Sequence, residues 1–382
     1  MSIIIKGSNF KSSNSKYIPC GKVTNVNHRN ADTKCYITWN DGEDLIIDGT
    51  RISSWNNTVL VRKENSMPNS ISDGSVILKN TIKDKYKNEY FIDSGLSQNT
   101  YYYYRFFTID NNKICNNALV GFKIYTSDKL ANADPVLENN SWGTINAVSS
   151  AGLARYIWKI GDEKKIHMES GYNGYADVED AYYTMQIWDF DHYDKVDGSG
   201  KAGICFGTKD TTTWYCKYDD STCYGYSHSD LFSMLNSYTN IYGSGEMLKS
   251  NDGLLDSIKP VIINASEYEN NKFILSTTES SIFAPCIEEL GFQLNSGSYV
   301  RNLGTKFPIF TDGWSRWKFK ANTADSDRIL GKNGSNYWVR DLNSTYRGDS
   351  IYNYLNTAVK TPGEISGCDL TSSNYVVFIF NV

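Results

Sequence analysis

The stretch Thr100-Tyr-Tyr-Tyr-Tyr-Arg-Phe-Phe-Thr108 decides how the first third of the chain is interpreted. Side chains of a β-strand alternate between its two faces, so Tyr102, Tyr104 and Phe106 share one face. That face can fill a hydrophobic core. The segment Lys34-Cys-Tyr-Ile-Thr-Trp39 alternates in the same way, with its cysteine, isoleucine and tryptophan on one face.

Further short strands are predicted on both sides of this stretch, and polar turns separate them. They comprise Thr58–Arg62, Glu89–Asp93 and Phe122–Tyr125. Between two of the strands, Asp93-Ser-Gly-Leu-Ser-Gln-Asn99 supplies the Gly and Asn that a chain reversal favours. This spacing is typical of a β-sandwich, which we expect over residues 19–127.

Length and charge limit the classes of protein that the chain can represent. Its 382 residues correspond to two or three domains. Lys and Arg total 38 against 43 Asp and Glu, so the net charge of −5 argues against nucleic acid as a partner. Because the chain has no run of about 18 or more uncharged apolar residues, no membrane insertion is expected. Residues 1–10 also lack the apolar core of a secretory signal.

The eight cysteines are scattered along the chain and form no C-x-x-C pair. This pattern lacks both the ligand spacing of a zinc ribbon and the motif of a dithiol redox site. We therefore expect reduced, mostly buried thiols.

The pattern of the sequence changes near Ser127, where strand alternation stops. A polar linker is predicted over residues 128–140, followed by a helix with Ser141 as its N-cap and Gly152 just beyond its C-terminus. A second helix is predicted over Ser229–Tyr238, which carries an apolar stripe at helical spacing. Strand candidates lie at Lys164–Met168, Tyr183–Phe190, Ala202–Gly207, Pro260–Asn264, Lys272–Leu275, Tyr337–Arg340 and Tyr375–Phe380. Helices and strands mixed without a βαβ order predict an α+β domain over residues 141–382.

Two features of this second domain lead to specific predictions. The segment Tyr375–Phe380 is apolar on both faces, which predicts a central strand rather than an edge strand. The segments Gly291–Thr305 and Asn343–Thr371 are rich in Gly, Asn and Ser. They are predicted to be surface loops, where binding residues tend to lie.

Three motifs in the first half carry a family resemblance: Ile37-Thr-Trp-Asn-Asp41, Thr58-Val-Leu-Val-Arg-Lys63 after Trp55, and Phe91-Ile-Asp-Ser-Gly-Leu96. Together they resemble the fibronectin type III-like modules of tail proteins from phages of Gram-positive bacteria. Such modules are spacers and connectors. The resemblance therefore implies that residues 19–127 hold a position and do no chemistry.

The second half carries motifs of its own, in order Ser141-Trp-Gly-Thr-Ile145, the block Trp188–Gly207, and Asn336-Tyr-Trp-Val-Arg340. They resemble a domain of unknown function at the C-termini of phage and prophage tail proteins in clostridia. That domain is similar in organisation to the C-type-lectin-like and formylglycine-generating-enzyme-like fold. Asp341 departs from the family pattern, which has a small residue there. The active cysteine pair of the formylglycine-generating enzymes has no counterpart, so their activity is not implied.

The aspartates from Asp189 to Asp197, with His192 among them, invite comparison with a calcium site, because Ca²⁺ prefers carboxylate and carbonyl oxygens. Their spacing differs from that of the EF-hand loop, and no Glu follows as a bidentate ligand. We expect instead a turn whose aspartates bind their own backbone, and we predict no metal and no cofactor.

The sequence contains no residues at a recognised catalytic spacing. Glu179-Asp180, Asp219-Asp220 and Glu288-Glu289 are adjacent dipeptides, which do not face one site as the two carboxylates of a glycosidase must. They are predicted to be solvated charges. The four histidines have no metal-binding or catalytic spacing, and no nucleophile elbow or phosphate loop is present. No catalytic residue is assigned, and no enzyme activity is expected.

Aromatic and arginine side chains gather in the last part of the chain. Exposed Trp and Tyr anchor interfaces and stack on sugars, and Arg binds carboxylate or phosphate through two hydrogen bonds. A receptor-binding site is predicted at Trp314, Arg316, Trp317, Arg328, Tyr346 and Arg347. The same stretch includes Tyr337 and Arg340, whereas Trp338 is predicted to be a core ring. The alternative for each of these side chains is a place in the core.

The sequence as a whole predicts a tail-fibre or receptor-binding component of a phage or phage-tail-like bacteriocin. Residues 1–18 would dock on baseplate or tail proteins, the sandwich would act as a spacer, and the lectin-like domain would bind a host cell-surface glycan or protein. A homo-oligomer is expected, because several copies on one particle strengthen attachment. The protein would lie in a virion tail or tail-like particle assembled in the host bacterial cytoplasm. The alternatives are a structural baseplate or tail protein without a receptor, and an enzyme that degrades cell-wall polymer.

Overall fold

β-Strands dominate both parts of the chain, and the helices are short. The computed structural model describes residues 17–116, 120–172, 177–220, 224–237, 248–269, 272–291, 302–310, 337–341, 343–347, 350–356, 364–369 and 373–382. The chain divides into two compact units, Met1–Ala131 (unit 1) and Asn132–Val382 (unit 2). None of the helices in these described ranges is long and apolar enough to cross a membrane.

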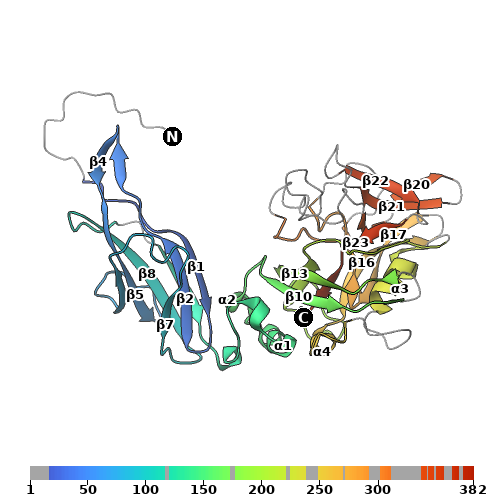
Figure 1. Ribbon diagram of the computed structural model, residues 1–382, viewed down its shortest axis with the longest axis horizontal. Helices are drawn as coiled ribbons and strands as arrows, with labels where there is room; N and C mark the ends of the chain where they lie inside the picture. Colours follow the sequence, from blue (N-terminus) through green and yellow to red (C-terminus); the bar gives the residue numbers. More distant parts are fainter. Residues whose placement is uncertain are drawn as a thin grey trace. The chain divides into compact units, whose positions relative to one another are not determined.

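Unit 1 is a β-sandwich, as the sequence predicts (Figure 1). One sheet has the strand order β1–β2–β7 and the other the order β6–β5–β8–β9, with all neighbours antiparallel. The strand bounds are β1 (Thr24–Asn30), β2 (Lys34–Asn40), β5 (Trp55–Glu64), β6 (Ser75–Asn80), β7 (Phe91–Ser94), β8 (Tyr101–Asp110) and β9 (Val120–Tyr125).

The core of unit 1 is formed by the strand faces that alternation predicts. Tyr102, Tyr104 and Phe106 on β8 are all buried. The Phe106 ring lies 5.1 Å from that of Trp39 on β2, and Tyr104 stacks on Phe122 of β9 at 4.9 Å. Aromatic rings in such pairs add stability beyond the area that they bury. The predicted alternation of both strands is confirmed.

Part of the sandwich was not predicted from the sequence. Thr24-Asn-Val-Asn-His-Arg-Asn30 forms β1 through backbone pairing with β2, although most of its side chains are polar. A hairpin of β3 (Leu45–Ile47) and β4 (Thr50–Ser53) was also not predicted, and Figure 1 shows it projecting beyond the end of the sandwich. Of the predicted docking segment 1–18, only Tyr17 and Ile18 are described.

The segment 128–140, predicted to be a linker, contains buried anchors rather than an extended polar spacer. It forms the short 3₁₀ helices η1 (Asp128–Leu130) and η2 (Leu137–Asn139). Leu130 and Leu137 are buried, and the Asn140 side chain donates to the carbonyls of Asp134, Val136 and Leu137. The boundary between the units falls inside this segment, after Ala131.

The first predicted helix of unit 2 has the expected ends. In α1 (Trp142–Ser150), Ser141 Oγ accepts a hydrogen bond from the backbone N–H of Thr144, and Gly152 follows with φ of +70°. Side-chain capping satisfies an N–H that the helix leaves free, and glycine adopts positive φ without strain. The other helices are α2 (Ala154–Ile157), η3 (Tyr226–His228), α3 (Asp230–Ser237) and α4 (Leu254–Ser257).

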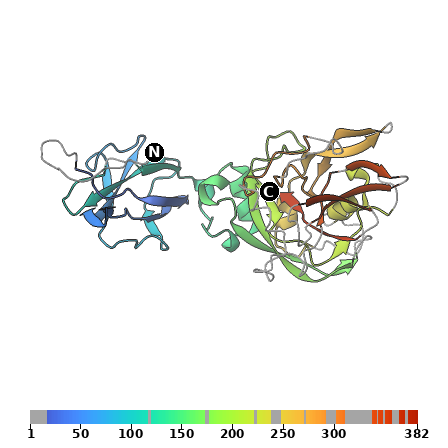
Figure 2. The same ribbon diagram turned by 90° about the horizontal axis from the view of Figure 1, so that it is seen from above.

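Two larger sheets organise unit 2 (Figures 1 and 2). The first has the order β10–β13–β14–β24–β18, and the second has the order β15–β23–β19–β21–β20, with β22 also pairing with β21. The bounds in the first sheet are β10 (Glu163–Met168), β13 (Ala181–Phe190), β14 (Ile204–Thr208), β24 (Ile379–Asn381) and β18 (Ile282–Phe283). Those in the second are β15 (Tyr215–Cys216), β23 (Asn374–Val376), β19 (Tyr337–Trp338), β21 (Ser350–Asn356), β20 (Asn343–Arg347) and β22 (Glu364–Asp369).

Two strand pairs complete unit 2. They are β11 (Gly171–Tyr172) with β12 (Asp177–Val178), and the hairpin of β16 (Val261–Glu269) and β17 (Lys272–Ser280). Figure 2 shows that hairpin, in orange, extending from the rest of the unit.

The apolar segment near residue 380 forms two strands instead of the single one that was predicted. The chain leaves the second sheet after β23, passes through Val377 and Phe378, and enters the first sheet as β24. Both strands have a neighbour on each side, and Val376, Val377 and Phe378 are buried. The prediction of a central position is confirmed, but the prediction of one continuous strand is wrong.

The prediction of a surface loop over Asn343–Thr371 is wrong, because β20, β21 and β22 pair within this segment. Backbone hydrogen bonds build these strands, whereas the polar composition suggested turns. Six cysteines are free thiols, namely Cys20, Cys35, Cys115, Cys205, Cys216 and Cys286. Burial raises the pKa of the Cys20 thiol to about 11, which keeps it protonated and unreactive.

Candidate functional site

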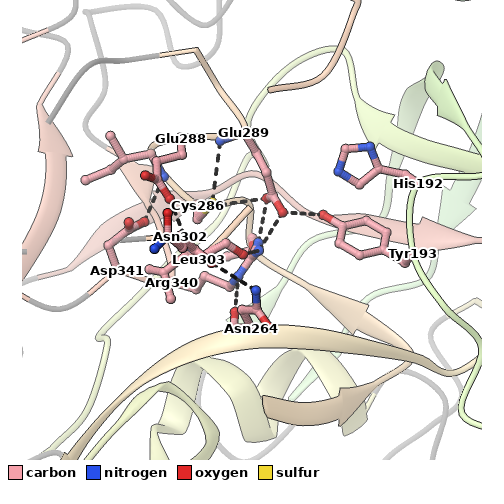
Figure 3. A network of polar contacts seen from close by, with 12 residues as sticks. His192, Tyr193, Asn264, Cys286, Glu288, Glu289, Asn302, Leu303, Arg340 and Asp341 are labelled. Atoms are coloured by element: carbon pink, nitrogen blue, oxygen red, sulfur yellow. Dashed lines mark hydrogen bonds and ion pairs between the residues drawn. The ribbon is translucent and has the colours of Figure 1, made fainter. Parts of the chain in front are cut away.

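A buried polar cluster in unit 2 is centred on Glu289 and Arg340 (Figure 3). Arg340 lies two residues after β19, and Glu289 lies in the turns after β18. Arg340 Nη1 donates to Glu289 Oε2 at 2.6 Å, and Nη2 donates to Oε1 at 2.5 Å. Both side chains have 0% exposure. Paired geometry of this kind suits the planar guanidinium group.

Each of the five N–H groups of Arg340 has an acceptor. Besides the two bonds to Glu289, Nε donates to the carbonyl of Asn264 at 2.8 Å, Nη1 to that of Ala284 at 3.0 Å, and Nη2 to that of Leu303 at 3.1 Å. A buried charge is tolerated only when such partners replace water. The side chain therefore joins three separate segments of unit 2 through their backbones.

Glu289 is equally well satisfied. Tyr193 Oη donates to its Oε1 at 2.6 Å, and the backbone N–H of Cys286 donates to Oε2 at 2.9 Å. Burial alone would raise the pKa of Glu289, but the adjacent Arg340 charge outweighs it and lowers the pKa below its usual value. Glu289 thus stays ionised, shielded from solvent, and has a structural role rather than that of a catalytic acid.

Asp341 extends the cluster on its other side. Its Oδ2 accepts the backbone N–H of Ile287 at 2.8 Å, and Glu288 Oε2 accepts that of Leu303 at 2.8 Å. Burial raises the pKa of Asp341 to about 7, only partly offset by that hydrogen bond and by Arg340. Asp341 is therefore a buried carboxyl group.

One prediction about this region is wrong, and one alternative that the sequence left open is decided. The Glu288-Glu289 dipeptide was predicted to be solvated, yet Glu289 is fully buried. Its burial could not be predicted, because its partner Arg340 is too distant in sequence to be recognised. Tyr337 and Arg340, considered with the receptor-binding residues, are core side chains. The prediction for Trp338 is confirmed, since its ring is buried and Nε1 donates to the carbonyl of Cys216 at 2.8 Å.

The structure does not bring the predicted receptor-binding side chains together. Trp314, Arg316, Trp317 and Arg328 lie outside the described residues. Tyr346 and Arg347 end strand β20, but their side chains are not among those described.

The segment 311–336, which holds the first four of these residues, has buried residues at both of its ends. Phe310 precedes it and packs on Trp188 with ring centroids 5.1 Å apart. Tyr337 follows it and is fully buried in β19.

The aspartates between Asp189 and Asp197 each have a protein partner. Asp189 Oδ2 lies 2.8 Å from His192 Nδ1, and Asp197 Oδ1 accepts the backbone N–H of Ser199 at 2.8 Å. Asp191 pairs with Arg155, and Asp194 pairs with Lys201. Within the described ranges, no group of three His, Cys, Asp or Glu side chains is arranged to hold a metal ion.

A second cluster lies on the surface, where sequence reasoning found nothing. His167 of β10 is paired directly with Tyr182 of β13, and their rings stack at 4.6 Å with an interplanar angle of 19°. His167 Nδ1 lies 2.9 Å from Ser250 Oγ, and Nε2 lies 3.1 Å from Asp180 Oδ1. Because Ser250 is 83 residues from His167 in sequence, no local motif could have revealed the cluster.

The order Ser250–His167–Asp180 resembles the nucleophile, base and carboxylate of hydrolases. In those enzymes, the carboxylate is buried and oriented by the protein. The Asp180 side chain is 62% exposed, so solvent screens its charge from the imidazole. We therefore interpret the cluster as a hydrogen-bonded surface group and not as a catalytic triad.

Comparisons with known proteins found only distant similarities in structure. No protein-family model and no curated protein matches the chain. A redesigned β-sandwich protein is 18% identical with a TM-score of 0.19, covering 28% of this chain and 94% of its own. The third fibronectin type III domain of a human protein is 13% identical with a TM-score of 0.19, covering 34% and 98%. A structure of titin kinase with its flanking domains is 11% identical with a TM-score of 0.21, covering 73% and 41%.

At a TM-score of 0.21, the similarity to the titin kinase structure does not assign an activity to this chain. For unit 1, the strand order and the buried faces of β2 and β8 carry the assignment to a β-sandwich. A fibronectin type III domain is among the structural neighbours of this mostly β-sheet chain.

Proposed function

We propose that the chain is a fibre or receptor-binding component of a phage tail or tail-like particle, and that it attaches to the bacterial surface without covalent chemistry. Unit 1 acts as a spacer, and unit 2, with its proposed C-type-lectin-like organisation, faces the host. Residues 1–18 dock on baseplate or tail proteins. Several copies assemble on one particle, which multiplies weak individual contacts.

The observation that carries the proposal is the network around Arg340. It fixes the residues on both sides of segment 311–336, called here the frame. Arg340 binds Leu303, shortly before Phe310, and follows directly on β19, where the segment ends. Recognition residues are commonly carried by segments that extend from a rigid scaffold. The charges of Arg340 and Glu289 are paired with each other inside that scaffold, which favours binding over catalysis.

The role of unit 1 as a spacer is supported by the use of its charged groups. Asp41 is buried and accepts hydrogen bonds from Trp39 Nε1 at 2.9 Å, Thr58 Oγ1 at 2.6 Å and Asn80 Nδ2 at 2.9 Å. One carboxylate thus links β2, β5 and β6. Buried and fully bonded polar groups make a domain rigid, and rigidity is what a spacer needs.

The experiment that tests the proposal measures attachment of the fluorescently labelled full chain to a panel of clostridial strains. We expect saturable attachment to a subset of strains, with residues 1–131 alone showing none. Competition by an excess of unlabelled full chain separates specific from non-specific attachment. Equal attachment by residues 1–131, or no attachment to any strain by a chain that still incorporates into tails, would contradict the proposal and favour a structural tail protein.

A further inference from the structure

We infer that the solvent face of β10 and β13 binds a neutral sugar, with the Tyr182 ring as a stacking platform. This inference rests on the proposed function, because it assigns the class of surface ligand that unit 2 recognises. The site is distinct from the residues predicted from the sequence. It consists of Tyr182, His167, Asp180 and Ser250, called here the Tyr182 platform.

The Tyr182 ring is held from one side and open on the other. Tyr182 is 71% exposed, although its ring stacks on His167. One ring face therefore contacts imidazole while the opposite face meets water. The face of an aromatic ring carries partial negative charge, which attracts the C–H bonds on the apolar side of a pyranose.

The support beneath the ring is ordered before any ligand arrives. His167 is held by Ser250 on Nδ1 and by Asp180 on Nε2. The neighbouring Asn251 fixes the Ser250 turn to β10, since its side chain accepts the His167 N–H at 2.7 Å and donates to the His167 carbonyl at 2.6 Å. A ring already held in place loses less conformational entropy on binding, so more of the stacking energy appears as affinity.

The polar groups of the platform serve the support and not the ligand. Ser250 and Asp180 bond to the two imidazole nitrogens, whose lone pairs and N–H bonds lie in the ring plane. Because that plane is within 19° of the Tyr182 ring, both groups lie on the side of Tyr182 that faces His167. A sugar on the open face is therefore held by stacking on the ring, which predicts weak binding.

The charges around the platform balance, which favours a neutral ligand. Along the same face, the next outward pair is Lys165 with Thr184, and Glu163 then pairs with Lys209 at 2.7 Å. With Asp180 included, positive and negative groups alternate. A phosphate polymer or a nucleic acid would need a positive field, which this face does not provide.

A peptide added as a further strand is not the expected ligand, because the edge of β10 is already capped. The N–H of Lys165 donates to Glu138 Oε2 at 2.7 Å, and both backbone groups of His167 are bound by Asn251. Strand addition requires free backbone groups on an edge. A quaternary ammonium ligand is also disfavoured, because its aromatic cages use several rings and Tyr182 offers one open face.

Saturation-transfer NMR on the full chain, with methyl glycosides of glucose, galactose and N-acetylglucosamine as probes and choline chloride as a further arm, tests the inference. We expect at least one glycoside to bind with a Kd of about 1 mM. Tyr182→Ala should weaken binding by about tenfold or more, whereas Tyr182→Phe keeps the ring and should bind nearly as the parent does. Tyr215→Ala removes a ring that is similarly exposed in the same unit and should have no effect.

The outcomes separate this inference from the proposed function. Glycoside binding that Tyr182→Ala abolishes, at an unchanged melting temperature, supports the platform. If none of the glycosides binds, if Tyr182→Ala binds as the parent does, or if choline alone binds, the inference is overturned. In the cell-attachment assay, a Tyr182→Ala chain that attaches like the parent overturns the platform and leaves the proposed function standing. Failure of the parent chain to attach to any strain contradicts the proposed function instead.

Discussion

Arg340 and Glu289 are joined by two parallel hydrogen bonds, of 2.6 and 2.5 Å, although neither side chain has any exposure to solvent. The pair connects the residues after β19 with the turns after β18. Coulombic attraction in such a place is strong, but so is the cost of removing both charges from water. The pair matters most for the segments that it ties together.

Removal of one partner should therefore strongly lower the stability of unit 2. Arg340→Met leaves Glu289 as an unpaired buried charge, and we expect unit 2 to lose about 3–5 kcal/mol of unfolding free energy. Urea unfolding of the full chain, followed by tryptophan fluorescence, measures this loss. Arg155→Met is the control, because it breaks an exposed pair with Asp191 and should cost less than about 1 kcal/mol. A stable Arg340→Met variant would show that the network does not hold the frame.

The stability of unit 2 should fall as pH rises from about 4 to 7. Burial raises the pKa of Asp341 to about 7 from 3.8, so within this window the folded state holds a proton that the unfolded state has released. Asp341→Asn cannot ionise and should flatten the decline, which at about 1.4 kcal/mol per pKa unit amounts to a few kcal/mol. Glu289, whose pKa is lowered from 4.5, has the opposite effect and changes stability only below about pH 5.

Unfolding free energies from urea titrations at several pH values between 4 and 8 would check this prediction. Asp210→Asn is the comparison, because burial also raises the pKa of Asp210, to about 6. Its effect should end at lower pH. The same slope in Asp341→Asn as in the parent would contradict the assignment.

Deletion of Tyr375–Val382 should unfold unit 2. The deletion removes β24 from between β14 and β18, and it takes from β23 two of its three residues. Near-UV circular dichroism should lose the signal of unit 2, while a protease-resistant fragment of unit 1 remains. A truncated chain with both unfolding transitions of the parent would show that the two sheets are stable without these strands.

Trp314→Ala and Trp317→Ala distinguish binding from core roles for the predicted receptor-binding residues. If either ring contacts the receptor, attachment should weaken by about 1–3 kcal/mol with an unchanged melting temperature. Trp338→Ala, which removes a ring known to be buried, should instead cost about 3–5 kcal/mol of stability. Both measurements should be made on all three variants. Loss of stability rather than of attachment in the first two would place those rings in the core.

Local patterns predicted much of the fold where the deciding contacts are local. Alternation on β8 identified Tyr104 as a core residue, and the pair Ser141 and Gly152 marked both ends of α1. Such features depend on the intrinsic geometry of strands and helix ends. Strand β1 was not predicted, because it is a strand through its pairing with β2 and not through its composition.

The clusters around Arg340 and His167 could not be predicted, because they depend on contacts between residues that are far apart in sequence. Nothing near Glu289 indicates a cation, and Arg340 lies in a stretch whose arginines suggested an exposed site. His167 and Ser250 are 83 residues apart in sequence, and Asn251, next to Ser250, binds the backbone of β10. Contacts of this kind depend on the topology of the sheets, which a single sequence does not specify.

The division of one apolar run between two sheets also constrains how unit 2 can form during synthesis. β14 is made long before its partner β24, and β15 long before β23. Neither sheet can close until residues 374–381 have left the ribosome, whereas all strands of unit 1 emerge early. We therefore expect unit 1 to fold while translation continues, and the nascent unit 2 to wait with exposed apolar strands, the state in which chaperones act and aggregation begins.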